Sequence, residues 1–593
     1  MKKLIVICFV FLFALVSSAS FAYQVPAFKG KGLIVTATRY LTPRISAPFS
    51  STVIDADDIA AMGSRNLAEA LQFTVGVDVK QMGSLGTTST LRLRGSTYEE
   101  VLVLLNGRRA NSPLLGGFAP EDVWLDNVER IEVVRFPVSS LYGADAVGGV
   151  INIITKKPQP GFSIETYFAT YDTQKYLIAA GSDILDFSAG YLKSNGFLTN
   201  NDYTSQNYTG AFKLGMVDID FGHYVGDKGV PGSTVFPTPN TRQVDRKSHI
   251  NFAAGGLSAF HDEKLQLFNS NPGTDPNSIY NCWTDSVGWQ QNLDILWNDL
   301  TYGAEWREDR GDSAAAGIHV VNNAGLFLAD EISFGDWATV NLGLRGDSHS
   351  VVGSSINPRV GMVFELARDL NLRMGVGSAY RVPTLNELYW YYLDPSWGIV
   401  TRGNANLKPE QSNSLEIGLE HEIDPKTRTS ISFYATETTD MIRWIDVSGT
   451  WMTWEAQNIA AAKAMGVEIE IARSFTDNFW GFLNYTYENA VDGTTGNHLT
   501  YSPLNKINAG LQYDSGKGCG LGLFARHVGE RYDDINNTRT VPCYTVADLN
   551  LWKKIADWTI NFGINNLGNE VYQDTLNYPM PGRTYTIGVK LIK

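Results

Sequence analysis

The chain has 593 residues, with 48 Lys and Arg against 62 Asp and Glu, so its formal net charge is −14 at pH 7. Only 19% of the residues are charged, and 12% are aromatic. This balance excludes a nucleic-acid partner, because phosphate binding needs a surplus of basic side chains on one face. The 56 glycines and many short alternating segments favour one large all-β body over several soluble domains.

The N-terminus has the pattern of an export signal. Lys2 and Lys3 precede an apolar run at 4–16, and Ser20 and Ala22 match the small residues that a signal peptidase reads. The run is too short to span a bilayer core of about 30 Å, so we predict a signal peptide at 1–22 instead of an anchor. No later apolar run reaches the length of about 18 residues that a membrane-spanning helix needs.

Three cysteines follow the signal peptide, at positions 282, 519 and 543. They are too few and too widely spaced for a disulfide scaffold or a cysteine-rich metal site. Cys519 and Cys543 are near enough in sequence to pair across a hairpin, and that pairing would leave one thiol over.

From about residue 159 onward, the chain is a series of strands in which apolar residues alternate with charged or small ones. The clearest segment, 415–423, alternates Leu and Ile with Glu and Gly, which gives each strand one apolar and one polar face. At about 20 residues for each membrane-spanning strand and its loops, this part holds about 22 strands. We predict a transmembrane antiparallel β-barrel at 159–593, and a barrel of that size needs a filled lumen.

Residues 46–158 have a different pattern, typical of a compact α+β unit. Asp57 or Asp58 is the expected cap of its first helix. Continuous apolar runs indicate strands that are buried on both faces. We expect helices from 55 onward and at 67–73, and buried strands at 101–105 and 150–154. This unit has the size of a plug domain for the lumen, with a periplasmic segment at 23–45 before it.

Several segments carry a resemblance to a known family. They are LRLRGSTYEEVLVLLNGRR at 91–109, VERIEVVRFPVSSLYGADAVGGVINIITKK at 128–157, YRVPTLNELY at 380–389, NANLKPEQSNSLEIGLE at 404–420, GVEIE at 466–470, and NNLGNEVYQ with PGRTYTIGVKL at 565–591. By these segments, the chain resembles the TonB-dependent outer-membrane receptors from about residue 33 to its end. It departs from the family at Phe136, where a glycine is usual, and at Lys593, where an aromatic residue is typical.

A short segment before the plug resembles the energy-coupling box of this family, in a form most like that of the cobalamin receptors. Its residues are Leu33, Ile34, Val35, Thr36 and Ala37. Such β-branched residues suit an extended segment that adds as a strand to the sheet edge of a partner. The resemblance implies that this partner is a TonB-like energy transducer.

The resemblance also implies contacts that hold the plug in place. In the family, two plug arginines face two barrel glutamates, and the matching positions are Arg94, Arg135, Glu416 and Glu468. The strand alternation independently places both glutamates on faces that point away from lipid. Because an arginine can fork onto a carboxylate, we predict a plug–barrel lock. Solvated lumen charges without pairing are the alternative.

Cargo is expected to bind outside, where plug apices at 81–90 and 111–120 meet barrel loops at 226–247 and 389–403. Large apolar side chains give such a site contact area at a low entropic cost. The predicted substrate-binding residues are Met82, Leu85, Leu114, Leu115, Phe118, Trp390, Tyr391, Tyr392 and Trp397. No metal site is expected, because Asp202 and Asp227 are too few carboxylates for calcium.

These features predict an outer-membrane receptor for energised uptake of a corrinoid such as cobalamin. A ferric siderophore or haem is the alternative cargo, and haem is disfavoured because 384–403 lacks the histidine that haem receptors of the family place there. An enzyme or a passive porin is not expected, since the histidines are scattered and the lumen is filled. We expect no cofactor, and a monomer in outer-membrane lipid.

Overall fold

The computed structural model describes residues 33–40, 42–272, 278–394 and 397–593. The predicted signal peptide at 1–22 lies outside the described residues, as do residues 23–32 after it. Among the described helices, none is long and apolar enough to cross a membrane. The plug and the barrel both belong to one unit, Leu33–Lys593.

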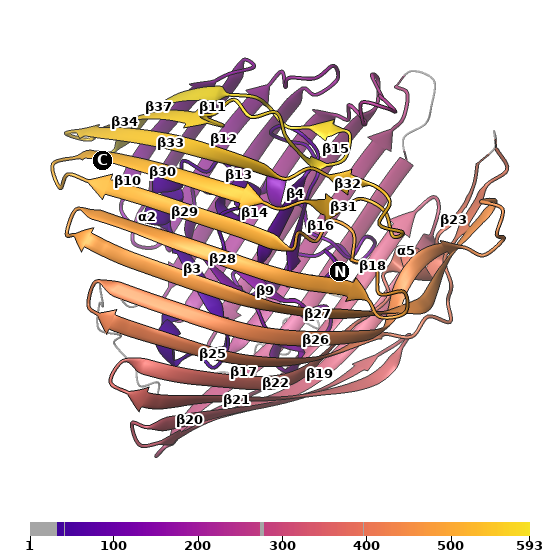
Figure 1. The fold of residues 1–593 in the computed structure, drawn as a ribbon, viewed down its shortest axis with the longest axis horizontal. Coiled ribbons are helices and arrows are strands. Elements are labelled where there is room, and N and C mark those ends of the chain that lie inside the picture. The colour runs from indigo at the N-terminus through magenta and orange to yellow at the C-terminus, as the bar shows by residue number, and fades with distance from the viewer. Residues whose placement is uncertain (1–32, 41, 273–277, 395–396) are drawn as a thin grey trace. The chain divides into compact units, whose positions relative to one another are not determined.

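A closed antiparallel barrel contains most of the described residues (Figure 1). Its 22 long strands follow chain order, and the last strand, β37 (Thr584–Ile592), pairs with the first, β10 (Gly161–Ala169). This closure leaves no bare strand edge, which a bilayer could not satisfy with hydrogen bonds. The predicted 22-stranded barrel is therefore confirmed.

The strands are joined by short turns at one end and by long loops at the other, where α5 (Leu385–Tyr389) and β23 (Tyr391–Leu393) project beyond the barrel (Figure 1). Barrels of this kind place their short turns in the periplasm and their long loops outside. The other long strands are β11 (Thr173–Gly181), β12 (Leu185–Ser194), β13 (Tyr203–Leu214), β14 (Val217–Gly229), β15 (Arg242–Ala254), β16 (Leu257–Asn269), β17 (Ser278–Ile295), β18 (Asn298–Ser313), β19 (Gly317–Phe334), β20 (Ala338–His349), β21 (Gly353–Ala367), β22 (Leu370–Arg381), β25 (Glu410–Asp424), β26 (Thr427–Asp446), β27 (Thr453–Thr476), β28 (Phe479–Asp492), β29 (Asn505–Asp514), β30 (Cys519–Val528), β33 (Tyr544–Ile555) and β34 (Trp558–Asn565). Short loop strands are β24 (Val400–Arg402), β31 (Arg531–Tyr532), β32 (Thr540–Val541), β35 (Gln573–Thr575) and β36 (Tyr578–Pro579).

The alternation of side chains along each strand separates the outer surface of the barrel from its lumen. On β25, Leu415 is 46% exposed on the outer surface, whereas Glu416 and Glu420 are 1% and 0% exposed inside. The apolar side chains thus face outward and the carboxylates face the plug, as the sequence pattern predicts.

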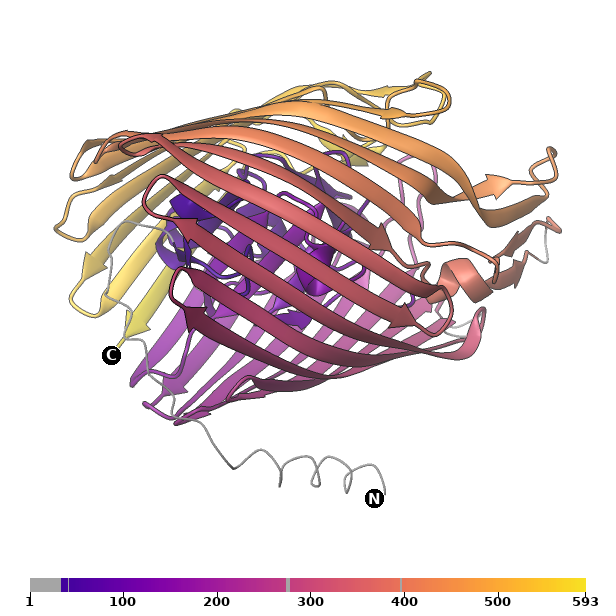
Figure 2. The same ribbon diagram turned by 90° about the horizontal axis from the view of Figure 1, so that it is seen from below.

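The plug lies inside the ring of barrel strands, where Figure 2 shows its indigo elements. Its main sheet has the strand order β3-β8-β9-β6-β7, in which β6 and β9 are parallel. The plug and its N-terminal extension consist of β1 (Leu33–Ile34), β2 (Thr42–Pro43), η1 (Arg44–Ser46), β3 (Ser51–Asp55), α2 (Ala56–Met62), α3 (Leu67–Leu71), β4 (Val77–Gln81), β5 (Ser89–Leu93), β6 (Val101–Leu105), β7 (Arg108–Arg109), η2 (Pro120–Asp122), β8 (Val128–Val134), α4 (Ser139–Tyr142) and β9 (Gly149–Thr155). Residues of β6, β8 and β9 are the centre of its apolar core, which confirms the two buried strands.

The first plug helix is capped by a different aspartate from the two expected. Asp55 accepts hydrogen bonds from the N–H groups of Asp57 at 3.0 Å and Asp58 at 2.9 Å, while the Asp58 carboxylate accepts one from the Asp55 N–H. The prediction of Asp57 or Asp58 as the cap is wrong because the helix begins at Ala56, directly after β3 ends at Asp55, so that Asp57 and Asp58 already lie in its first turn.

The family departure at Phe136 is accommodated by glycines of the barrel wall. The ring of Phe136 stacks on Phe49 with centroids 4.1 Å apart. A Cβ on Gly377 would lie 3.0 Å from the Phe136 ring, and one on Gly375 would lie 2.7 Å from Phe49. A large plug residue therefore fits here because these positions of β22 have no side chain.

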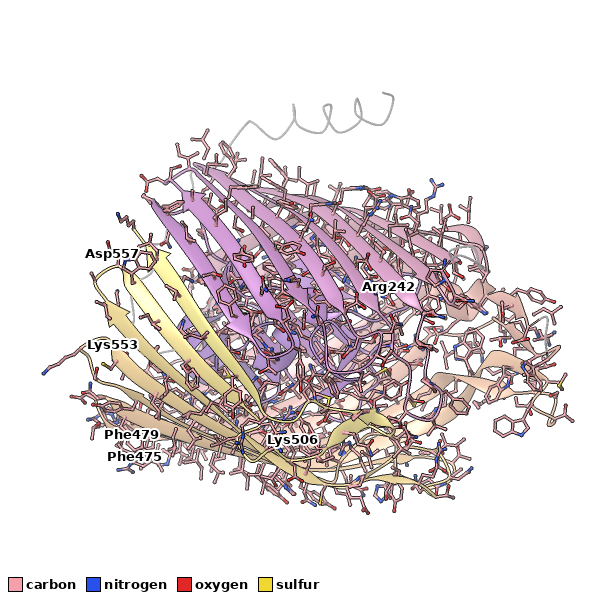
Figure 3. The ribbon with its side chains drawn as sticks, turned by 90° about the horizontal axis from the view of Figure 1, so that it is seen from above. Arg242, Phe475, Phe479, Lys506, Lys553 and Asp557 are labelled. Carbon is pink, nitrogen blue, oxygen red and sulfur yellow. The ribbon has the colours of Figure 1, made fainter. Side chains whose placement is uncertain are left out.

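The structure rules out the pairing of Cys519 with Cys543. Cys519 begins β30 opposite Lys553, at the end of the barrel with short turns (Figure 3), whereas Cys543 directly precedes β33 at the other end. The length of β33 separates the two thiols by about 30 Å, and a disulfide requires Cα atoms within about 7 Å. All three described cysteines are free.

Candidate functional site

The segment at 33–38, here called the coupling segment, is folded against the plug. Only its first two residues are extended, as β1 paired with β2, and Val35 to Thr38 form a turn closed by the Arg39 N–H on the Val35 carbonyl at 2.8 Å. Ile34, Thr36 and Ala37 are 0% exposed. The expected fully extended strand is therefore not present in this state, and the side chains of Ile34, Thr36 and Ala37 are not exposed to a partner.

One carboxylate holds the turn of the coupling segment. Oε2 of Glu132, on β8, accepts hydrogen bonds from the N–H groups of Val35 and Thr36 at 2.9 Å each and from the Thr36 hydroxyl at 2.6 Å. Arg130 binds the other oxygen of Glu132 at 2.8 Å, and Glu132 is 0% exposed. Because successive N–H groups of a strand point to opposite sides, one of these two would face a partner's sheet edge if the segment were added to it as a strand. Such a partner would have to displace Glu132 from that N–H group.

The residue after the coupling segment is fixed to the barrel. The Arg39 guanidinium lies 4.6 Å from the ring centroid of Tyr142 in the plug and 4.2 Å from that of Phe327 in the barrel. It also donates to Glu305 at 2.7 Å. Plug, barrel and coupling segment thus meet at one charged side chain.

We expect Glu132→Gln to loosen the coupling segment, because hydrogen bonds to a charged acceptor are stronger than those to a neutral one by about 1 kcal/mol or more. A cysteine introduced by Val35→Cys should then react with a periplasmic thiol reagent about tenfold faster than in the parent. Glu129→Gln is the matched control, since Glu129 lies on the same strand, has a side chain that is 44% exposed, and pairs with Arg130. Equal labelling rates in the Glu132 variant and the control would contradict a retaining role for Glu132.

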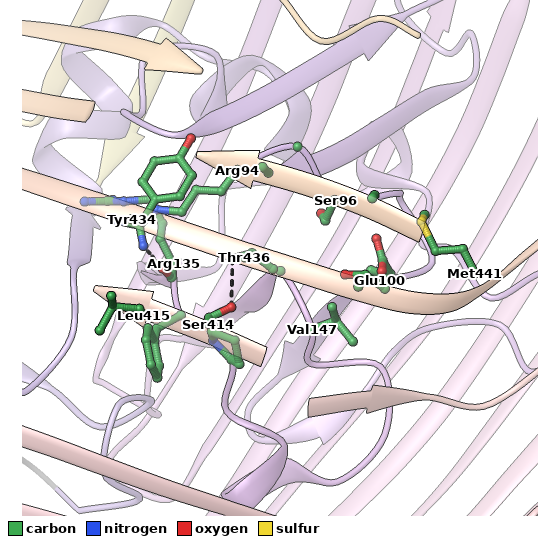
Figure 4. A pocket seen from close by; sticks show the side chains of 17 residues that line it. Arg94, Ser96, Glu100, Arg135, Val147, Ser414, Leu415, Tyr434, Thr436 and Met441 are labelled. Carbon is green, nitrogen blue, oxygen red and sulfur yellow. Dashed lines mark hydrogen bonds between the residues drawn. The ribbon is translucent and has the colours of Figure 1, made fainter. Parts of the chain in front are cut away.

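The four residues of the predicted plug–barrel lock lie together and are buried. Arg94 forks onto Glu468 with bonds of 2.9 and 2.8 Å and donates to Glu416 at 2.5 Å. Arg135 donates to the same Glu468 at 3.0 Å. Each of the four side chains is at most 6% exposed, and Figure 4 shows both arginines beside the strand of Tyr434. Such a group of charges requires mutual pairing, because an unpaired charge is costly away from water.

Sequence reasoning missed two members of this cluster. Arg135 also donates to Glu470 at 2.9 Å, and the Arg94 guanidinium lies 4.4 Å from the ring centroid of Tyr434. The Glu470 contact had a signal, since residues 468 and 470 fall on the same face of a strand. Gly76 gives the cluster its room: a Cβ there would lie 2.2 Å from the Glu468 carboxylate.

A small cavity of about 30 Å³ adjoins the cluster, between the plug and strands β25 to β27 (Figure 4). Its lining includes Arg94, Glu100 and Met441. Burial, together with the nearby charge of Glu410, raises the pKa of Glu100 to about 8. The cavity is lined by polar groups and has room for a water molecule, so the interface between plug and barrel is not fully close-packed at this point.

At the outer face, the predicted substrate-binding residues differ in exposure. Leu115, Tyr391, Tyr392 and Trp397 are exposed, whereas Met82, Leu85, Phe118 and Trp390 are half-buried. Leu114 is 2% exposed and packs against Leu385 and Cys282, so it contributes to packing and not to an open surface. The exposed residues belong to one plug apex and to the loop after α5.

Asp202 and Asp227 share one arginine. Arg242, labelled in Figure 3, donates to Asp202 at 2.7 Å and to Asp227 at 2.5 Å. Because the guanidinium occupies the space between the carboxylates, a cation there would have to displace it. Among the described residues, no group of three or more His, Cys, Asp or Glu is arranged to hold a metal ion.

Two family models match the chain. The model described as "TonB-dependent Receptor Plug Domain" matches residues 43–150, and the model "TonB dependent receptor-like, beta-barrel" matches residues 156–567. The chain belongs to the TonB-dependent receptors. It is therefore an outer-membrane protein of a family of receptors and transporters that interact with TonB and bind large substrates.

Known relatives of this receptor carry different cargoes. The chain is 26% identical over 591 residues to the vitamin B12 transporter BtuB of Photobacterium profundum, covering 93% of this chain and 94% of the relative. Among solved structures, it resembles the siderophore receptor PirA of Acinetobacter baumannii, with a TM-score of 0.79, 18% identity and coverage of 93% and 99%. It also resembles the ferripyoverdine receptor of Pseudomonas aeruginosa, with a TM-score of 0.74, 16% identity and coverage of 95% and 89%. The structural likenesses support the shared fold and leave the cargo open.

Proposed function

We propose that this receptor takes up a corrinoid such as cobalamin across the outer membrane, driven by TonB. The observation that carries the proposal is the chemistry of the two plug apices, 81–90 and 111–120. Neither contains a charged residue, and both combine amides and hydroxyls with Leu, Met or Phe. Such a surface suits a large cargo with an apolar face and many amide groups, because it offers hydrogen bonds and contact area without net charge.

The cations near the outer face support the same cargo. An anionic ferric chelate would be bound by arginine or lysine side chains that are free to pair with it. Here Arg242 is paired with two aspartates, Arg402 with Glu455, and Arg539 with Asp533. Binding an anion at these residues would first require breaking an existing pair. The match to a vitamin B12 transporter over 93% of the chain agrees with a corrinoid.

The proposed cycle links cargo to the coupling segment. Cargo binds at the apices, the contacts of Glu132 and Arg39 with the coupling segment open, and TonB pairs with the freed strand and pulls. The four-residue lock of Arg94, Arg135, Glu416 and Glu468 then yields stepwise, since each arginine can release one carboxylate at a time. No cofactor takes part in this cycle.

Equilibrium binding to the purified receptor tests the cargo. We expect saturable binding of cobalamin, weaker binding of cobinamide, and no binding of haem or of a ferric siderophore panel. Leu115→Asp should weaken cobalamin binding at least about tenfold, because it places a charge in an apolar contact. Ile535→Asp, at an exposed position of an outer loop that is outside both apices in sequence, should leave it unchanged. Binding of a siderophore without cobalamin would contradict the proposal.

A ferric siderophore is the second candidate, and one observation favours it. The loop after α5 exposes Tyr391, Tyr392 and Trp397, which are 58%, 48% and 74% exposed. Aromatic faces of this kind also stack on the aromatic rings of a chelate. In the same binding panel, this candidate predicts a siderophore response that falls on Trp397→Ala and no cobalamin response.

A further inference from the structure

A second cavity of about 30 Å³ lies between the plug hairpin of β4 and β5 and the barrel wall at β29, β30 and β33. It is at the outer end of the lumen, because Lys506 and Tyr544 lie at the start of β29 and β33, where both strands leave an outer loop. Figure 3 shows Lys506 away from Lys553 and Asp557, which mark the end with short turns. The basic residues of its lining are Lys80, Arg92, Lys506, Arg526 and Arg531.

Backbone carbonyls accept the hydrogen bonds of three of these basic side chains. Arg92 donates to two carbonyls, at 2.8 and 2.7 Å. Lys506 donates to the Val77 carbonyl, and Nη2 of Arg531 donates to two more carbonyls, at 2.9 and 3.0 Å. A carbonyl satisfies a donor but carries no net charge, so these contacts leave the positive charge uncompensated.

Two carboxylates of the lining offset only part of this charge. Asp78 Oδ1 lies 3.6 Å from Lys506 Nζ, and Asp574 Oδ1 lies 3.7 Å from Arg531 Nη2. Among the described residues, the other three basic side chains of the lining have no carboxylate oxygen within 4.0 Å of their charged nitrogens. Because an unpaired charge is costly away from water, this surplus of cations favours a further anion in the cavity.

The carboxylates behind the lining already have partners of their own. Asp533 pairs with Arg539 at 2.6 Å. Asp548 accepts a hydrogen bond from a backbone N–H at 2.7 Å, and Glu488 accepts hydrogen bonds from two hydroxyls. Their charges reduce the positive potential of the cavity, but none of them lines it, so none contacts an ion inside it.

Arg526 is the donor of the cavity with the fewest partners. It is 5% exposed, and its guanidinium lies 5.5 and 5.8 Å from the ring centroids of Tyr544 and Tyr572. Among the described residues, its Nε–H has no hydrogen-bond partner. A buried donor without a partner is costly, and an anion against this N–H would satisfy the donor and the charge together.

Lys80 carries the effect of the surplus charge on the plug side of the cavity. Burial, together with the nearby charge of Arg92, lowers the pKa of Lys80 to about 8. Its ammonium lies 4.1 Å from the ring centroid of Tyr501. A neighbouring anion favours the charged form of a lysine, so an ion in the cavity would keep Lys80 protonated at neutral pH.

An adjoining cavity of about 90 Å³ gives a small ion access to Arg526. Gln72 and Arg526 line both cavities. The larger cavity extends to Tyr171 and Pro581, which belong to connections at the outer end of the barrel. An ion from the external medium therefore reaches the smaller cavity without passing the plug–barrel lock.

We propose that the smaller cavity binds one small monovalent inorganic anion such as chloride, held by Arg526, Lys506 and Lys80. A volume of about 30 Å³ admits one ion of the size of a water molecule, whereas a tetrahedral oxyanion brings four oxygens of that size. The ion joins the plug to the barrel, because Lys80 lies on the plug hairpin and the other two residues lie on the wall. Since the cavity is too small for a metal chelate, this site is separate from that of the cargo.

Crystals of the full receptor soaked in sodium bromide test the site directly, because bromide replaces chloride and is located by its anomalous scattering. We expect an anomalous peak in contact with Arg526 and Lys506. The absence of a peak at this place would overturn the proposal.

Hydrogen exchange tests the binding in solution. The amides of β4 and β5 should exchange at least about fivefold more slowly in sodium chloride than in sodium gluconate of equal ionic strength, because an ion bound to the closed state stabilises it. Gluconate is too large for the cavity, and equal ionic strength keeps the screening the same. A bromide peak together with equal exchange rates in the two salts would indicate an adventitious ion only, and would also overturn the proposal.

Variants connect the chloride effect to this cavity. Arg526→Gln should remove it, and Lys80→Gln, which leaves the barrel wall unaltered, should reduce it at least about twofold. Arg539→Gln is the matched control, since Arg539 has a side chain that is 63% exposed and does not line the cavity. Resistance of each variant to unfolding in cold detergent on a gel verifies that the barrel is intact. A chloride effect that persists in full in Lys80→Gln and in Arg526→Gln would contradict the assignment.

Discussion

Replacing Val35 with proline is expected to reduce TonB-driven uptake to the background measured without TonB, while cargo binding stays unchanged. Proline has no N–H, and strand addition needs the backbone donors of the coupling segment. The same N–H binds Glu132 at 2.9 Å in the resting state, so the substitution also removes one retaining contact. Uptake of labelled cargo by whole cells, beside binding to isolated membranes, measures the two effects separately.

Val35→Ala is the matched control for this result, because alanine keeps the backbone N–H and shortens the side chain to a similar extent. It should retain most of the uptake. If Val35→Pro supports uptake at the rate of Val35→Ala, energised transport does not proceed through this segment. If both variants lose uptake, the Val35 side chain and not its backbone is what the transducer reads.

Arg94→Met is expected to lower the free energy of unfolding of the plug by about 3–5 kcal/mol. The substitution leaves the carboxylates of Glu416 and Glu468 buried with fewer partners, and an uncompensated buried charge is strongly destabilising. Hydrogen exchange of the amides of β6 and β9 in a urea series measures the effect on the plug alone, because the barrel strands report their own stability separately.

Arg402→Met is the control for the arginine cluster. Arg402 pairs with Glu455 at 2.6 Å but is 52% exposed, so its loss should change stability by less than about 1 kcal/mol. Arg94→Lys should lower the free energy of unfolding by an intermediate amount, since lysine keeps the positive charge but cannot form the paired hydrogen bonds of a guanidinium. If the amides of β6 and β9 exchange hydrogen at the same rate in Arg94→Met and in Arg402→Met, the cluster does not hold the plug.

Most of what could be predicted about the barrel from the sequence came from the periodicity of its strands. A period of two is exact in a β-strand, so the alternation placed Glu416 and Glu468 on the lumen face. The length of the alternating part, at about 20 residues for each strand and its loops, gave the number of strands. The family motifs then placed Arg94 and Arg135 opposite them, and the structure brings all four together. The helix cap at Asp55 was missed because the end of a strand, and not the helix pattern, decides where the helix begins.

Other contacts join residues that no local pattern connects. Glu132 meets Thr36 across 96 positions in the sequence, and the turn of the coupling segment has no periodicity from which to predict it. Leu114 was predicted to be open to cargo, but the contacts of α5 bury it.

The sequence by itself determined the membrane barrel, its plug, the identity of the paired charges and the segment proposed to engage TonB. The barrel and the plug follow from composition and from the period of two along each strand. The paired charges and the coupling segment follow from short motifs that resemble those of the family. Only the tertiary structure decided that Glu132 binds the coupling segment and which outer residues are exposed. Those features depend on the closure of the ring and the seating of the plug in it, because closure fixes the register between strands that are distant in the chain.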